Sequence, residues 1–163
     1  MKHLSILGST GSIGTNTLAI VSRYPERFSI DALCAGRNVG LLAEQIKMFQ
    51  PELAVVLDDA SAEALQGQIP PDMNVTIMSG PEGYRAAAIL GKVDMVVSAI
   101  VGAAGLKPTL EAVRRGACVA FANKEALVCA GDLFMAEARR SGATLLPVDS
   151  EHNAIFQAFD ENQ

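Results

Sequence analysis

The stretch Leu4-Ser-Ile-Leu-Gly8-Ser-Thr-Gly11-Ser-Ile-Gly14 joins an apolar run directly to a turn that contains three glycines. Apolar residues on both faces are typical of a strand inside a parallel sheet, and glycines permit a tight turn. Beyond the turn, Ile13, Thr17 and Ile20 recur at helical spacing. The stretch therefore predicts a buried strand, a tight turn and a helix that begins near Ser12.

This turn predicts a site for the pyrophosphate of a dinucleotide. The start of a helix carries about half a positive charge and unpaired N–H groups, and small glycines let a phosphate approach them closely. The spacing is G-x-x-G-x-x-G, which differs from the more common G-x-G-x-x-G. A turn that only connects strand and helix is the alternative. Its position, directly behind an N-terminal strand and before an amphipathic helix, favours the phosphate site.

The end of the second predicted strand bears on the choice between NAD and NADP. In NAD sites an acidic residue usually stands there and binds the ribose 2′-hydroxyl. Here strand 28–34 is followed by Ala35-Gly-Arg-Asn38, which contains no carboxylate. The guanidinium of Arg37 can pair with the 2′-phosphate of NADP. The sequence therefore favours NADP, and a solvated loop arginine is the alternative.

Composition limits the class of protein. The chain has 163 residues, half of them hydrophobic, which suits one domain that buries about 70% of its unfolded surface. A net charge of −5 without a basic run argues against nucleic-acid or membrane partners. The three cysteines are widely spaced, and no signal peptide or membrane-spanning run is present. We expect reduced thiols that pack as small core residues, and a cytoplasmic protein.

After residue 38 the chain alternates between helical and strand patterns, which is typical of α/β proteins. We expect further strands at 53–57, 75–78, 93–100, 117–121 and 143–146. Helices are expected at 42–49, 60–66, 82–90, 106–113 and 132–141. The predicted fold is a Rossmann-like, doubly wound, mostly parallel sheet with helices on both faces.

Two later strand ends carry residues suited to a ligand, because open α/β sheets bind ligands at the carboxyl ends of their strands. The small residues 101–105 follow strand 93–100 and allow either a cofactor or the next helix to approach closely. Asn123, Lys124 and Glu125 follow strand 117–121 and could contact both cofactor and substrate. A solvated helix start with Asn123 as N-cap is the alternative.

The segment 147–153 follows the last predicted strand and holds the densest group of polar residues. Asp149 and Glu151 supply two hard oxygen donors, which suit Mg²⁺ or Mn²⁺. A helix start capped by Asp149 or Ser150 is the alternative. Two carboxylates do not fill an octahedral shell, so further ligands would be needed.

Three segments together resemble a known family: residues 6–14, residues 99–106 with 122–125, and residues 146–157. The chain is similar to the N-terminal part of the 1-deoxy-D-xylulose 5-phosphate reductoisomerases, NADPH-dependent enzymes of non-mevalonate isoprenoid biosynthesis. The last segment is highly specific. The similarity extends to about Phe156 and covers nearly the whole chain.

The resemblance implies roles for particular residues. The positions that match the family's NADPH contacts are Thr10, Gly11, Ser12, Ile13, Gly36, Arg37, Asn38, Asn123 and Glu125. Those that match its substrate contacts are Lys124, Ser150 and Glu151. Asp149 and Glu151 match two ligands of the divalent cation, which could be Mg²⁺, Mn²⁺ or Co²⁺. Lys124 and Glu151 are the expected catalytic residues, and His152 is expected to be structural.

The reaction that the resemblance implies is the conversion of 1-deoxy-D-xylulose 5-phosphate, a phosphosugar, to 2-C-methyl-D-erythritol 4-phosphate. Family members continue well beyond residue 163. We therefore expect a truncated chain with an NADPH-binding domain at 1–147 and the start of a catalytic domain at 148–163. Such a chain should be inactive alone and could be monomeric, whereas the full-length protein is expected to be a homodimer.

Two other functions fit parts of the sequence. A free-standing NADP-binding module without catalysis would use the glycine turn but would not need Asp149 and Glu151. A different NADP-dependent reductase, acting on a semialdehyde, would need a nucleophilic cysteine in a polar setting. The sequence around Cys34, Cys118 and Cys129 offers none.

Overall fold

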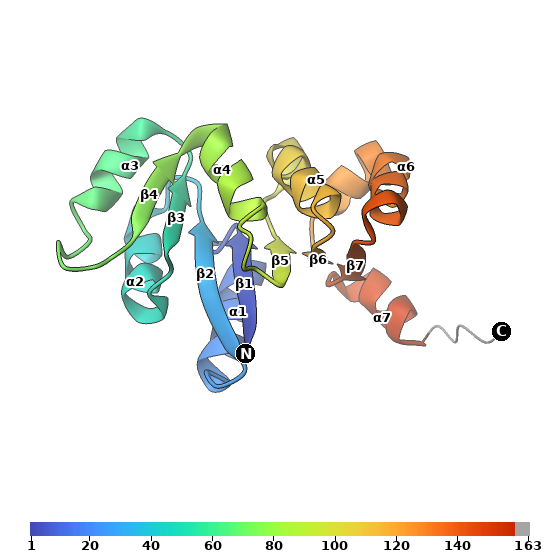
Figure 1. Ribbon diagram of the computed structural model, residues 1–163, viewed down its shortest axis with the longest axis horizontal. Coiled ribbons are helices and arrows are strands. Elements are labelled where there is room, and N and C mark those ends of the chain that lie inside the picture. Colours follow the sequence, from blue (N-terminus) through green and yellow to red (C-terminus); the bar gives the residue numbers. More distant parts are fainter. Residues whose placement is uncertain (159–163) are drawn as a thin grey trace.

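Seven parallel strands form one sheet in the computed structural model (Figure 1). The structure describes residues 1–158, and the side chains of all of these except Lys124, Ser150, Glu151 and His152. The strands are β1 (Lys2–Leu7), β2 (Phe28–Cys34), β3 (Leu53–Val56), β4 (Thr76–Ser79), β5 (Met95–Ser98), β6 (Cys118–Phe121) and β7 (Thr144–Pro147). Their order across the sheet is β4-β3-β2-β1-β5-β6-β7.

Helices cover both faces of this sheet. The helices α1 (Ser12–Arg23), α2 (Val39–Phe49) and α3 (Asp59–Gln66) contribute buried apolar residues to one core. The helices α4 (Gly80–Ala88), α5 (Leu106–Arg114) and α6 (Lys124–Ser141) contribute to the core on the other face. A short 3-10 helix, η1 (Gly102–Gly105), precedes α5, and α7 (Ser150–Ala158) follows β7.

The central strand shows why the sheet is apolar on both faces. Ile6 belongs to the core under α1 and α2, whereas its neighbour Leu7 belongs to the core under α4 and α5, and both are fully buried. Alternate residues of a strand point to opposite faces, so a sheet covered on both sides needs apolar residues at consecutive positions. The prediction of a doubly wound parallel sheet is confirmed.

The direction in which strands are added to the sheet reverses between β1 and β5. The chain builds outward from β1 to β4 and then crosses back to place β5 against β1. In the register, Leu7 lies opposite both Cys34 of β2 and Ser98 of β5, so the three strands end in line. Doubly wound sheets bind ligands at such a reversal of strand order.

The helix expected at 132–141 begins eight residues earlier than predicted, at Lys124. Asn123 caps it by accepting a hydrogen bond from the N–H of Ala126 at 2.9 Å. Non-helical backbone angles at Ala130, just before Gly131, kink α6. This interruption divides the helical pattern, so the sequence analysis predicted only the part of α6 that follows the kink.

One expectation about the cysteines is wrong. All three are free thiols, as expected, and Cys34 is fully buried. Burial raises the pKa of the Cys34 thiol far above its ordinary value. However, Cys118 is only half-buried, and Cys129, on α6, is exposed. An apolar sequence neighbourhood does not tell which side of a helix faces solvent.

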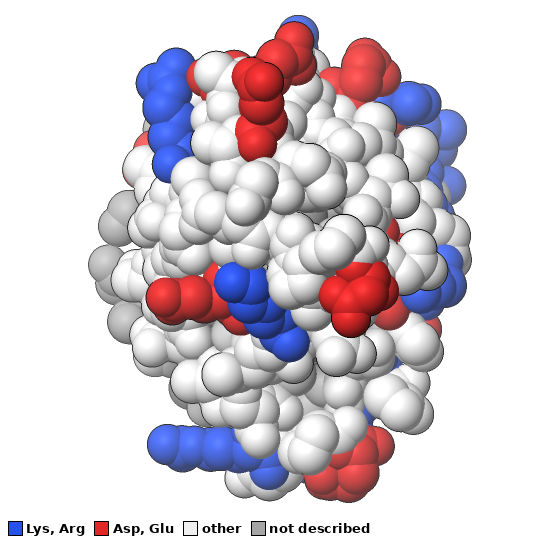
Figure 2. All heavy atoms as spheres, turned by 90° about the vertical axis from the view of Figure 1, so that its left-hand side faces the viewer, with Lys and Arg blue, Asp and Glu red and all other residues white. Residues whose placement is uncertain are grey.

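Charged side chains are interspersed on the side of the molecule formed by β4, α2 and α3. Figure 2 shows that Lys and Arg lie among Asp and Glu there and form no continuous basic area. Among residues 1–158, no helix is both long enough and apolar enough to cross a bilayer.

The packing of α6 can be tested through Phe134. Its ring is fully buried and meets Phe121 edge to face, with centroids 5.2 Å apart. Phe134→Ala should lower the free energy of unfolding by about 3–5 kcal/mol in urea titrations followed by circular dichroism. Leu133→Ala, at a side chain with 43% exposure on the same helix, should cost less than about 1 kcal/mol. Equal effects would contradict this packing.

Candidate dinucleotide-binding site

The turn after β1 is built by backbone contacts. Gly8 has a φ of +97°, and the N–H groups of Gly8 and Ser9 both donate to the carbonyl of Cys34, at 2.9 and 2.7 Å. A Cβ added to Gly8 would lie 2.6 Å from the carbonyl oxygen of Ala99. Only glycine therefore allows the ends of β1 and β5 to approach this closely.

The other two glycines of the turn differ from each other. A Cβ on Gly14 would lie 2.3 Å from the carbonyl oxygen of Gly8, so Gly14 is needed for α1 to pack on the turn. A Cβ on Gly11 would meet only that same oxygen, at the ordinary contact distance of 3.5 Å. Gly11 also lines the pocket described below. Gly8 and Gly14 thus shape the turn, whereas Gly11 leaves room for a ligand.

The start of α1 can bind an anion. Its N-cap is Gly11, which provides no side-chain cap, and its first turn contains no acidic residue. The positive end of the helix is therefore neither capped nor neutralised by these residues. Three of the four predicted contacts, Thr10, Gly11 and Ser12, lie in this turn or open the helix, and Ile13 follows in its first turn.

The second predicted loop, Gly36-Arg37-Asn38, connects β2 to α2, and Asn38 is the N-cap of that helix. The Arg37 side chain is 74% exposed and donates to Asp58 through Nε and Nη2, at 3.2 and 3.0 Å. A guanidinium has several N–H donors, so this pair leaves others for a phosphate. The structure thus places the guanidinium, paired with Asp58, beyond the carboxyl end of β2.

The contact of Asp58 with Arg37 is a feature that the sequence analysis missed. Asp58 follows β3 and caps α3, and hydrogen bonds from Ser61, with a smaller effect of Arg37, hold the pKa of its carboxyl below the ordinary value. We predicted that no carboxylate stands at the end of β2. The loop residues 35–38 indeed contain no carboxylate, but Asp58, which follows the neighbouring strand β3, contacts Arg37. Only the pairing of β2 with β3 could have revealed this.

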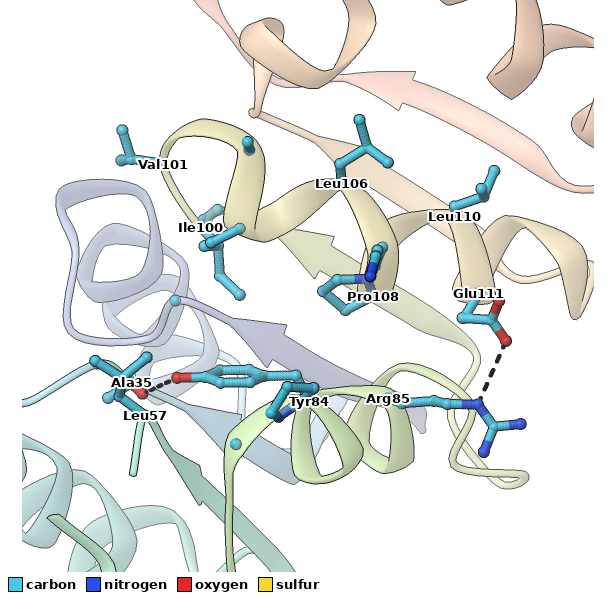
Figure 3. Close-up of a pocket in the computed structure, with 18 of the residues that line it drawn as sticks. Ala35, Leu57, Tyr84, Arg85, Ile100, Val101, Leu106, Pro108, Leu110 and Glu111 are labelled. Carbon is cyan, nitrogen blue, oxygen red and sulfur yellow. Dashed lines mark hydrogen bonds and ion pairs between the residues drawn. The ribbon is translucent and has the colours of Figure 1, made fainter. Parts of the chain in front are cut away.

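A cavity of about 1170 Å³ runs along this edge of the sheet. It begins at Gly8 and Gly11, passes Gly36 and continues between α4 and α5 (Figure 3). The Arg85–Glu111 ion pair, 3.5 Å long, joins the two helices, and both residues line the cavity (Figure 3). The lining is mainly apolar, as is typical of small-molecule sites.

Asn123 links the segment after β5 to the start of α6 through side-chain hydrogen bonds. Its buried side chain donates through Nδ2 to the carbonyls of Ile100 and Gly102, at 2.7 and 3.0 Å, and its Oδ1 caps α6. Both amide hydrogens are therefore used within the protein. The alternative of an N-cap is correct, and the side chain also holds the small residues before α5 in place.

The structure describes the remaining predicted residues mainly through their backbone. Lys124 and Glu125 open α6, and Glu125 is exposed. Asp149 follows β7, and Ser150 and Glu151 open α7, so a helix begins in this segment. In the part of the chain that the structure describes, no group of three or more His, Cys, Asp or Glu side chains could hold a metal ion.

These residues lie in a fixed order along one edge, because each follows a parallel strand. The Arg37 loop follows β2, the glycine turn follows β1, and Asn123 follows β6. With about 4.8 Å between neighbouring strands, the β2 and β6 ends are about 14 Å apart, and the β7 end lies one strand further. A long ligand with phosphates near its middle and at one end fits this arrangement. The fold and the site define a dinucleotide-binding α/β domain.

Comparison with known proteins identifies the family. Residues 4–131 match the family model described as 1-deoxy-D-xylulose 5-phosphate reductoisomerase, and the chain belongs to that family. The reductoisomerase of Desulfosudis oleivorans is 54% identical over 162 residues, which are 99% of this chain and 42% of the relative. That of Chlorobaculum tepidum is 54% identical over 158 residues, 97% of this chain and 41% of the relative. The chain thus spans about two-fifths of the length of these relatives.

Solved structures agree with this assignment. A DOX-P reductoisomerase in complex with NADPH, fosmidomycin and magnesium superimposes with a TM-score of 0.95 at 42% identity, covering 99% of this chain and 40% of that one. The Zymomonas mobilis enzyme in complex with NADPH gives a TM-score of 0.94 at 43% identity, covering 99% and 42%.

The different roles of the glycines can be tested by two single substitutions. Gly11→Ala should lower the free energy of unfolding by no more than about 1 kcal/mol, because only the N-cap preference is lost and its Cβ meets no close atom. It should weaken NADPH binding by about tenfold or more by filling the proposed phosphate site. Gly14→Ala should lower the free energy of unfolding by about 2–4 kcal/mol, because its Cβ overlaps the Gly8 carbonyl. Isothermal calorimetry and urea titration would measure both effects. The reverse pattern would contradict this assignment.

Proposed function

We propose that this chain binds NADPH along the carboxyl edge of its sheet and forms the cofactor-binding part of a 1-deoxy-D-xylulose 5-phosphate reductoisomerase. The observation that carries the proposal is the order of the site along that edge. Arg37 at the end of β2, the open start of α1 and the Asn123 region after β6 follow one another in a line. An extended dinucleotide needs these features in that order.

In the proposed complex, each part of the cofactor meets one segment. The N–H groups and small residues at Thr10, Gly11, Ser12 and Ile13 hold the pyrophosphate. Gly36, Arg37 and Asn38 hold the 2′-phosphate of the adenosine. Asn123, through the loop that it fastens, and Glu125 lie toward the nicotinamide end. NADPH, when bound, supplies the hydride for the reduction. Residues 1–147 constitute the cofactor domain.

The substrate and a metal ion would lie one strand further along, after β6 and β7. We propose that Lys124 and Ser150 contact the phosphosugar, and that Asp149 and Glu151 are ligands of a divalent cation. Carboxylates are the donors that Mg²⁺ and Mn²⁺ prefer. Such a cation, when bound, supplies a Lewis acid for the carbonyl of the substrate. Lys124 would orient substrate oxygens, and Glu151 would bridge metal and substrate. We propose a homodimer for the full-length protein.

Cofactor preference tests the first half of this proposal. In calorimetric titrations of the 163-residue chain, NADPH should bind at least about tenfold more tightly than NADH. Arg37→Gln should weaken NADPH binding by about 10- to 100-fold, because charge-assisted hydrogen bonds to the 2′-phosphate are lost, and should leave NADH unaffected. Arg27→Gln is the matched control, since Arg27 lies against the rings of Tyr24 and Phe28, away from the site. Equal affinity for both cofactors would refute the role of Arg37.

Activity tests the second half. A chimera in which this chain replaces the matching part of the Desulfosudis oleivorans relative should oxidise NADPH when given 1-deoxy-D-xylulose 5-phosphate and Mg²⁺. Asp149→Asn or Glu151→Gln in that chimera should lower turnover by about 100-fold or more while NADPH still binds. Glu63→Gln, at an exposed residue of α3, is the control. Full turnover by either carboxylate variant would rule out the proposed metal ligands.

A further inference from the structure

Tyr84 lines the cavity, although it belongs neither to the glycine turn nor to the Arg37 loop. It belongs to α4, and this helix packs very closely on the sheet at Gly83, the residue before Tyr84. A Cβ on Gly83 would lie 2.7 Å from Cγ1 of Val55. This close packing fixes the first turns of α4 and places the next side chain, that of Tyr84, at the edge of the sheet.

The hydroxyl of Tyr84 is anchored to the loop after β2. It donates a 2.6 Å hydrogen bond to the carbonyl oxygen of Ala35, two residues before Arg37. Burial raises the pKa of Tyr84 to about 12, so the phenol keeps its proton at neutral pH and remains a donor. The anchor leaves the aromatic ring with little freedom to rotate out of the cavity.

The ring of Tyr84 forms part of the wall of the cavity. In Figure 3 it is seen edge-on above α4, and Ile100 and Pro108 lie across the cavity from it. Leu57, at the end of β3, lines the same part of the cavity. An aromatic face on one side and aliphatic groups on the other form a slot suited to a planar heteroaromatic ring.

We propose that Tyr84 is a cofactor-binding residue whose ring stacks on the adenine of NADPH. The inference rests on the proposed function, which places the 2′-phosphate of the same nucleoside at Arg37. Because Tyr84 is hydrogen-bonded to the strand end that leads to Arg37, one ligand can reach both side chains. The ring supplies the stacking surface on which the affinity depends.

The chain offers a direct spectroscopic test, because it contains two tyrosines and no tryptophan. Tyr24, the C-cap of α1, is not among the residues that line the cavity. In a Tyr24→Phe variant, tyrosine emission reports Tyr84 alone. Titration with 2′,5′-ADP, which carries the adenine and the 2′-phosphate, should quench that emission with the dissociation constant found by calorimetry. The same titration of Tyr84→Phe should leave the emission of Tyr24 unquenched.

Affinity separates stacking from a purely structural role. Tyr84→Leu removes the aromatic face and should weaken 2′,5′-ADP and NADPH by about tenfold. Tyr84→Phe keeps the face, loses only the bond to Ala35, and should bind within about threefold of the wild type. Tyr24→Leu is the matched control. If Tyr84 only supported the fold, the Phe and Leu variants would lose affinity together, and the emission of Tyr84 would not respond to ligand.

The outcomes are distinguishable. A wild-type chain that binds neither NADPH nor 2′,5′-ADP overturns the proposed function and this inference together. A wild type that binds both, with unquenched Tyr84 emission and unchanged affinity in Tyr84→Leu, overturns only the inference. If Tyr84→Leu does not fold, quenching in the Tyr24→Phe variant and the affinity of Tyr84→Phe still decide the question.

Discussion

The close contact between Gly8 and Ala99 is the constraint on which the site depends. It brings the ends of β1 and β5 together without side chains between them, and Gly14 then sets α1 against the same turn. Because the backbone itself closes this junction, the helix start faces open space and not another side chain. The proposed phosphate site is therefore a consequence of strand order and of two glycines, before any polar residue is considered.

Charged side chains are arranged differently at the amino-terminal and carboxyl-terminal ends of the strands. Near the amino-terminal ends of β1 and β5, the buried carboxylate of Asp31 pairs with His3 at 2.7 Å and with Lys92 at 3.3 Å, and Lys92 also pairs with Glu52. Asp31 is the buried member of this group, and the ammonium of Lys92, whose side chain is 46% exposed, compensates its charge from the surface. At the carboxyl ends, the start of α1 has no side-chain cap and Arg37 is mostly exposed. The uncapped N–H groups at the start of α1 can therefore bind an anionic ligand at the carboxyl edge.

The sequence predicted those features whose causes are local. The apolar run, the glycines and the helical spacing after residue 12 all lie within 20 residues, and the structure forms the strand, turn and helix expected there. Features that depend on residues distant in the chain were missed. Asp58 contacts Arg37 from 21 positions further along the chain, and Tyr84 donates to Ala35 from 49 positions further along. The first half of α6 was also missed, because the kink at Ala130 interrupts its helical pattern. Exposure of Cys129 likewise depends on how a kinked helix docks, which spacing alone does not determine.

The strand order has a consequence for synthesis on the ribosome. β1 pairs on one side with β2, which follows within the first 34 residues, but its other partner, β5, ends only at Ser98. One edge of this central strand therefore stays open while some sixty intervening residues emerge, with the buried residues Ile6 and Leu7 next to unpaired backbone groups. At typical translation rates of about 5–20 residues per second this lasts several seconds. During that interval the open edge of β1 in the nascent chain is exposed to edge-to-edge association with other chains, long before a cofactor can bind.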